Sequence, residues 1–125
     1  MPEDNQANRQ VDQFILDEID SVPHLEALLL FWKRRPHGWS VEEMAHSLYI
    51  SVETTHTILQ DLEQRGMVTV EEERYSFDPN FRQGSLMEEL DRTYRRELVR
   101  ISRMIHSKAS PAVREFARAF KFTKD

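Results

Sequence analysis

Most apolar residues of this chain recur every three or four positions, which is the spacing of a helix with one buried face. Residues 1–8 are the exception: they are polar, include a proline and lack apolar spacing, so they are predicted to form a disordered tail. Residues 9–20 are predicted to form a short amphipathic helix that docks on another part of the protein. Its apolar positions are Val11, Phe14, Ile15 and Ile19.

Two further helices follow, and each begins at a residue suited to cap it. Ser21 can cap the first, which ends before Pro36 because a proline cannot continue a helix. Ser40 and Glu43 then have the spacing of a capping box, in which each side chain bonds a backbone amide of the first turn. This pattern predicts a second helix that ends at about Leu48.

A third helix is predicted over Val52–Arg65, with Ser51 as its cap. Gly66 stands just past its end, where a residue in the left-handed conformation is usually needed. The stretch that follows, MVTVEEERYSFDP, alternates apolar and polar positions, which is the pattern of β-strands. It predicts a β-hairpin with Glu71–Arg74 at its tip, ended by Pro79.

A long helix is predicted over Ser85–Lys108, where Ser85 and Glu88 again have capping-box spacing. Its apolar residues form one stripe at three- and four-residue intervals. They are Leu86, Leu90, Tyr94, Leu98, Ile101 and Ile105. Ser110 and Pro111 predict the start of a short final helix, whose inward residues are Val113, Phe116 and Phe120.

The order of these elements, with an extended Trp39 between the first two capped helices, is that of a winged helix-turn-helix. Residues 21–79, about half of the chain, resemble the winged-helix domains of small bacterial transcription regulators of the MarR-like and PadR-like groups. The residues that carry the resemblance are Ser40, Met44, Leu48, Ser51, Ile58, Leu59, Leu62 and Gly66. It implies a mainly α fold, three helices plus a β-hairpin wing, with helical extensions over residues 9–20 and 85–125.

The resemblance also implies an assembly, because such regulators often keep a dimerisation helix where residues 85–108 stand. The helix predicted there is longer than one small winged domain can cover. The N-terminal helix could cover part of the apolar stripe, and a second copy of the long helix the rest. We therefore expect a homodimer, whose two-fold symmetry suits two reading helices on a palindromic operator.

Charge is unevenly distributed along the chain, whose net charge is −5. Residues 1–30 have one basic and seven acidic side chains, residues 31–79 have five and nine, and residues 80–125 have eleven and six. A nucleic-acid-binding domain usually has a positive footprint across its reading surface. Here the positive charge is concentrated in the last third, outside the predicted winged domain.

In a winged helix-turn-helix the third helix enters the major groove of DNA. The residues of this helix predicted to face outward and read bases are Glu53, His56, Thr57, Gln60 and Gln64. Glutamine can pair with adenine, glutamate can accept from cytosine, and threonine can meet the thymine methyl group. Phosphate neutralisation normally dominates affinity for DNA, yet the helix offers only Arg65, at its end.

Cations that bind phosphate must therefore come largely from the flanks of the domain. The candidates are Lys33, Arg34, Arg35, Arg65 and Arg74. Arg74 is predicted at the wing tip, where an arginine can enter the minor groove. Its neighbours Glu71, Glu72 and Glu73 oppose this, either as a refusal of DNA or as ordinary charges that protect an exposed hairpin edge.

Four arginines of the C-terminal helix lie opposite its apolar stripe, namely Arg92, Arg96, Arg100 and Arg103. This basic strip either binds nucleic acid or an acidic protein partner, or is a solvated face with pairs such as Glu88 and Arg92. The acidic first 30 residues are a candidate partner for it, within one chain or between two.

The sequence offers little for catalysis or metal binding. It has no cysteine, its three glycines are scattered, and its five histidines lack HxxxH or HExxH spacing. We expect no enzyme activity, no metal and no cofactor. The longest apolar run, Ala27–Trp32, is too short to span a bilayer and the first residues resemble no signal peptide, so a cytoplasmic protein is expected.

Two functions remain open. One is a dimeric DNA-binding transcription regulator, whose third winged-domain helix reads the major groove. The other is a winged-helix protein–protein interaction module without DNA affinity, which the acidic wing and the negative net charge favour. The first is preferred because of how such folds are generally used, which is an analogy at the level of the fold.

Overall fold

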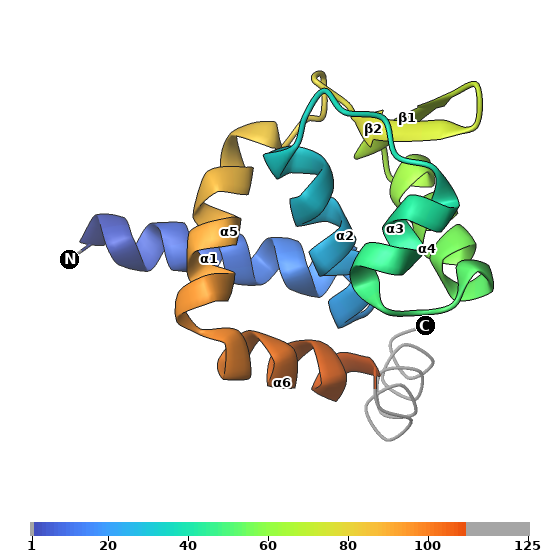
Figure 1. Ribbon diagram of the computed structural model, residues 1–125. Helices are drawn as coiled ribbons and strands as arrows, with labels where there is room; N and C mark the ends of the chain where they lie inside the picture. Colours follow the sequence, from blue (N-terminus) through green and yellow to red (C-terminus); the bar gives the residue numbers. More distant parts are fainter. Residues whose placement is uncertain (1, 110–125) are drawn as a thin grey trace, which may run out of the picture. The chain divides into compact units, whose positions relative to one another are not determined.

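The computed structural model describes the backbone of residues 2–109 and the side chains of residues 8–108. Within this part the chain forms helices and a two-stranded antiparallel sheet (Figure 1). It divides into two compact units. The winged unit is Pro23–Asp91, and the terminal unit combines Met1–Val22 with Arg92–Asp125. The short final helix predicted from Ser110 lies outside the described residues.

The body of the winged unit consists of the helices α2 (Val22–Lys33), α3 (Val41–Leu48) and α4 (Val52–Gln64). α3 begins with the predicted capping box. The backbone N–H of Glu43 donates to Ser40 Oγ at 3.1 Å, and the backbone N–H of Ser40 donates to Glu43 Oε1 at 2.9 Å. Both bonds satisfy amides that the first turn of a helix leaves without partners.

α4 also begins and ends at residues that suit its termini. The backbone N–H of Thr54 donates to Ser51 Oγ at 3.1 Å, so Ser51 is the N-cap. The helix ends one residue earlier than predicted, with Arg65 as the C-cap. Gly66 follows with φ 75°, in the left-handed region that glycine adopts without strain.

The wing is a hairpin of the strands β1 (Val68–Glu71) and β2 (Arg74–Phe77). Glu72 and Glu73 form its tip, with φ of 51° and 64°. Positive φ at both central residues is the geometry of the tight two-residue turn that best matches the twist of a hairpin. The acidic residues therefore occupy the turn itself.

Trp39 adds a short bridge to the edge of the wing. Its backbone N–H donates to the carbonyl oxygen of Tyr75 at 2.7 Å, and its carbonyl oxygen accepts from the N–H of Tyr75 at 2.8 Å. The buried indole packs edge-on against the ring of Phe31, with centroids 6.3 Å apart. The segment between α2 and α3 is thereby tied both to the wing and to the core.

The core of the winged unit is formed by one face of each helix and the base of the wing. Its fully buried side chains include Leu25, Leu28, Phe31, Met44, Leu59, Leu62 and Met67. The buried residues of α4 are Thr55, Ile58, Leu59 and Leu62, as its helical spacing predicted. Burial of a large aliphatic side chain stabilises a fold by roughly 1.5–3 kcal/mol, so one face of α4 is firmly held.

The terminal unit contains α1 (Pro2–Glu18), the end of α5 (Met87–Arg96) and α6 (Leu98–Ala109). α5 itself begins in the winged unit, after a single 3₁₀ turn, η1 (Gly84–Leu86). α1 begins at Pro2, although a disordered tail was predicted over residues 1–8. Proline and acidic residues, which suggested a loop, suit the first turn of a helix equally well. No helix in the described part of the chain has the length and apolar character needed to cross a membrane.

Polar contacts join α1 and α6 within the terminal unit. Arg100 Nη1 donates to Asp12 Oδ2 at 2.9 Å, and Arg100 Nε donates to Glu97 Oε1 at 2.7 Å. Lys108 Nζ donates to two backbone carbonyl oxygens near the end of α1, at 3.0 and 2.6 Å. The acidic N-terminal segment is thus an internal partner of the basic C-terminal helix, one of the two arrangements that the charge gradient allowed.

The long helix predicted over Ser85–Lys108 is not continuous. It is interrupted at Glu97, where the chain changes direction between α5 and α6 (Figure 1). Four residues of the predicted dimerisation stripe, Leu90, Tyr94, Ile101 and Ile105, are buried within the single chain, whereas Leu98 is 51% exposed. The bend lets residues on both sides of Glu97 face the interior of their own chain, so most of this stripe is not open to a second copy.

Candidate nucleic-acid interface

The outward face of α4 carries the residues that were predicted to read bases. Glu53, His56, Thr57, Gln60 and Gln64 are all exposed. This face presents amides, a hydroxyl and an imidazole, with Glu53 as the acid among the five. Its orientation follows from the opposite face, which the core of the winged unit holds in place.

The turn between α3 and α4 exposes two residues that were not predicted to contribute. Tyr49 is the C-cap of α3, with φ 59° and ψ 40°, and is 92% exposed. Val52, the first residue of α4, is 48% exposed. The sequence offered one indication of this exposure. Both residues lie within two positions of the Ser51 cap, and neither belongs to the apolar face predicted for the helix before or after it.

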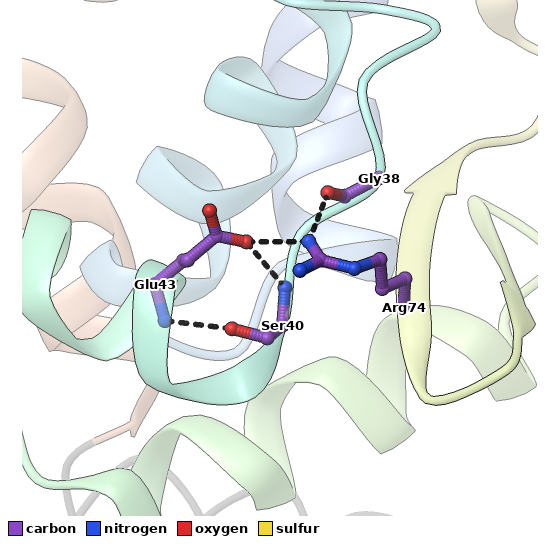
Figure 2. Close-up of polar contacts among 4 residues, drawn as sticks. All are labelled: Gly38, Ser40, Glu43 and Arg74. Carbon is purple, nitrogen blue, oxygen red and sulfur yellow. Dashed lines mark hydrogen bonds and ion pairs between the residues drawn. The ribbon is translucent and has the colours of Figure 1, made fainter.

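Arg74 pairs with Glu71 and closes the turn at the wing tip, within the Glu71–Arg74 tip that was predicted. It is the first residue of β2, and its Nη1 donates to Glu43 Oε1 at 2.8 Å and to the carbonyl oxygen of Gly38 at 3.0 Å (Figure 2). A Cβ on Gly38 would come within 3.3 Å of Arg74 Cβ, so the glycine leaves room for this approach. Arg74 therefore ties the wing to α3, where a free charge for phosphate was expected.

Glu43 serves two partners with one carboxylate oxygen, as Figure 2 shows. The pKa of Glu43 is lowered, first by the hydrogen bond from the backbone of Ser40 and then by that from Arg74. Both bonds favour the ionised carboxylate. At neutral pH, Glu43 thus holds the helix cap and the wing together.

A hollow of about 480 Å³ lies between the start of α3, the first half of α4 and the wing. Its lining includes the acidic Glu42, Glu72 and Glu73, beside His56 and Arg74. Because the charge of Arg74 is offset by Glu43, acidic groups dominate this hollow. A phosphate group would be repelled here.

Lys33, another predicted phosphate-binding residue, is paired inside the winged unit. Its Nζ lies 3.2 Å from Oδ1 of Asp91, which is buried. The winged unit has six basic and thirteen acidic residues, a net charge of −7, so each cation paired in this way matters. Lys33 mainly neutralises a carboxylate of its own unit.

Arg34 and Arg35 remain exposed at the end of α2. The Arg34 guanidinium is 6.0 Å from the ring centroid of Trp39, and that of Arg35 is 4.7 Å from the ring centroid of Trp32. An arginine stacked on an aromatic ring still has N–H donors at its edge. With the exposed Arg65, these are the winged-unit candidates best placed to meet a phosphate.

The basic strip of the C-terminal helices is only partly used in contacts within the chain. Arg92, Arg96, Arg100 and Arg103 are all exposed. The two ion pairs of Arg100, with Asp12 and Glu97, raise the pKa of its guanidinium further above its ordinary value. Arg96 and Arg103 keep the strip open to an outside partner.

Three helices and a hairpin wing, extended by helices at both ends, define the class of this fold as a winged helix-turn-helix. Solved structures of MarR-type regulators share it. A MarR family protein from Mycobacterium tuberculosis is 18% identical, with a TM-score of 0.56 over 99% of this chain and 89% of that one. MepR, a transcription regulator of the Staphylococcus aureus multidrug efflux pump MepA, is 16% identical, with a TM-score of 0.53 over 97% and 88%. A MarR family protein from Bacillus stearothermophilus is 17% identical, with a TM-score of 0.52 over 96% and 84%.

No protein-family model matches the sequence, and no curated protein matches it. At such low identities the structural likeness establishes the fold alone. The predicted fold, a mainly α winged helix-turn-helix of MarR-like type with helical extensions, is confirmed.

Proposed function

We propose that this chain is a DNA-binding transcription regulator that reads the major groove with α4. The observation that carries the proposal is the division of α4 into two faces. One face is buried in the core, and the other exposes five side chains that can bond base edges. The likeness of the fold to MepR, a transcription regulator, supports the same use.

Affinity for the DNA backbone comes from arginines outside the outward face of α4. Arg34 and Arg35 lie at the end of α2, and Arg65 lies at the end of α4. The wing contributes little, because Arg74 is bonded to Glu43 and the tip is acidic. The regulator therefore holds DNA mainly through its helices.

The regulator acts as a homodimer that assembles through its terminal unit. Leu16, Leu98 and Val99 are 44%, 51% and 62% exposed, and all three belong to this unit. They offer apolar area that a second copy can bury, unlike most of the predicted stripe. A two-fold pair would present two copies of α4 to a palindromic site.

The acidic wing favours a second candidate function, a module that binds a basic protein segment. Glu71, Glu72 and Glu73 are exposed, while the neighbouring Arg74 is withdrawn to Glu43. Charge complementarity would select a partner rich in lysine and arginine. Such a module would have no affinity for duplex DNA.

A titration against a fluorescent random-sequence duplex separates the two functions. The wild-type protein should raise the anisotropy at low salt, and its affinity should fall steeply with salt as counterions are released. The double variant Arg34→Glu/Arg35→Glu should bind roughly tenfold or more weakly, because two phosphate contacts become repulsive. Arg96→Glu/Arg103→Glu, the same charge change on the terminal unit, should bind as the wild type does.

Two results would contradict the regulator. One is an absence of wild-type binding at low salt, which would favour the protein-binding module. The other is equal weakening by both double variants, which would move the DNA contact away from the winged unit.

A further inference from the structure

Tyr49 combines two features that are unfavourable for a folded protein in isolation. It is 92% exposed, and the next most exposed large apolar residue in the described part of the chain, Val99, is at 62%. Its backbone lies in the left-handed region, which a residue with a side chain adopts at a cost and where glycine or asparagine usually ends a helix. Residues held in such conformations cluster at binding sites, where the side chain gives a benefit that the fold alone does not.

The position of Tyr49 connects it to α4. Tyr49 caps the end of α3 and Ser51 caps the start of α4, so the tyrosine projects from the turn that leads into the groove-reading helix. In helix-turn-helix proteins the N-terminal residues of that helix approach the bases. A side chain just before them therefore meets the DNA backbone at the edge of the groove.

The chemistry of this turn suits a phosphate better than that of the wing. Ser47, Tyr49 and Ser51 are exposed hydroxyl residues. The Ser51 hydroxyl is used in capping, whereas the Tyr49 phenol forms no hydrogen bond with another described residue. Tyrosine hydroxyls are among the groups that bind phosphate oxygens. The wing tip, by contrast, presents Glu72 and Glu73.

We propose that Tyr49 is a DNA-backbone contact, in which the phenol hydroxyl donates to a phosphate oxygen at the edge of the groove that α4 enters. This inference rests on the proposed function and names a contact within it. It also supplies a neutral hydrogen bond in a unit where Lys33 and Arg74 are paired with acids. A neutral donor adds affinity without releasing counterions.

The test measures binding of the full chain to the random-sequence duplex across a range of salt concentrations, together with thermal unfolding. Tyr49→Phe removes only the hydroxyl and should weaken binding about threefold to tenfold, the effect of one hydrogen bond. The slope of log affinity against log salt should stay at the wild-type value, since no charge is lost. Tyr75→Phe removes a phenol hydroxyl from a buried position in the winged unit and should bind as the wild type does.

Tyr49→Gly separates a DNA contact from a purely structural role of Tyr49, because the two predict different unfolding temperatures. Glycine adopts the left-handed conformation without strain, so the unfolding temperature should stay equal or rise while the affinity falls at least as far as in Tyr49→Phe. Wild-type affinity in Tyr49→Phe, or a lower unfolding temperature in Tyr49→Gly, overturns the proposal and leaves the regulator intact. If the wild-type protein binds no duplex, the regulator and this contact fail together.

Discussion

The outward face of α4 and the wing differ in charge. The five outward residues of α4 that were predicted to read bases are all exposed, and only Glu53 among them is acidic, whereas the tip of the wing consists of Glu72 and Glu73. In the wing, Arg74 is bonded to Glu43 and to the carbonyl oxygen of Gly38. The two elements of a winged helix can therefore be specialised separately: here α4 keeps a surface suited to base edges, and the wing acts as a brace for α3.

The largest expected effect is on the free energy of unfolding, when substitutions on the buried and the exposed face of α4 are compared. Leu59 is fully buried and Gln60, beside it, is exposed. Leu59→Ala should lower the free energy of unfolding by about 2–5 kcal/mol, because it removes buried methyl groups and leaves a cavity. Gln60→Ala should change it by no more than about 0.5 kcal/mol while weakening sequence-specific binding. Chemical denaturation measures the first quantity, and similar destabilisation in both variants would contradict the assignment of the faces.

A smaller effect should follow from neutralising the wing tip. Glu72→Gln/Glu73→Gln removes two negative charges that would repel the DNA backbone at long range in the proposed complex, so affinity for a random duplex should rise roughly threefold to tenfold at low salt. The double variant Glu88→Gln/Glu89→Gln makes the same charge change at the start of α5 and serves as the control. Equal gains in both variants would mean that net charge, and not the position of the wing, governs binding.

The smallest expected effect is on the unfolding temperature, when Glu43, which joins the wing to α3 through Arg74, loses its charge. The pKa of Glu43 is lowered from its ordinary value of 4.5, so its ionised form is favoured by folding and stabilises the protein above about that pH. This contribution is lost as the pH falls through the lower pKa of the folded state. Glu43→Gln keeps a capping acceptor but loses the charge. Its unfolding temperature should therefore lie slightly below that of the wild type at pH 7, and the gap should begin to close below about pH 4.5 and disappear below the lower pKa of the folded state.

The control for the brace is the neighbouring residue Glu42, which forms none of the described hydrogen bonds to Ser40 or Arg74. In Glu42→Gln the unfolding temperature should follow that of the wild type through the same pH range. A gap that persists for Glu43→Gln at low pH would show that the carboxylate charge is not what holds the wing.

The helix-turn-helix was predictable because its signals are local. Ser40 with Glu43, Ser51 and Gly66 each act within four residues, and the structure places every one of them at a helix end. The alternation that predicted the wing is also local. The fold and the outward face of α4 follow directly from such short-range rules.

Contacts between distant residues were not predictable in this way. Arg74 meets Glu43, 31 residues away, and Arg100 meets Asp12, 88 residues away. The spacing of apolar and polar residues along the chain does not indicate which of several acidic side chains will form an ion pair with a given arginine. These pairings and the bend at Glu97 therefore lay beyond the sequence, and the phosphate-binding and dimerisation roles of the residues named from it stay predictions.

Photo-crosslinking tests the contrast between α4 and the wing most directly. A photoreactive amino acid is placed at Gln60 of α4 or at Glu71 of the wing, both of which are exposed, and each protein is irradiated with a labelled random duplex at low salt. We expect strong crosslinking to DNA from position 60 and little from position 71. Crosslinking from position 71 alone, or from neither position under conditions where the protein binds the duplex, would contradict the role given to α4.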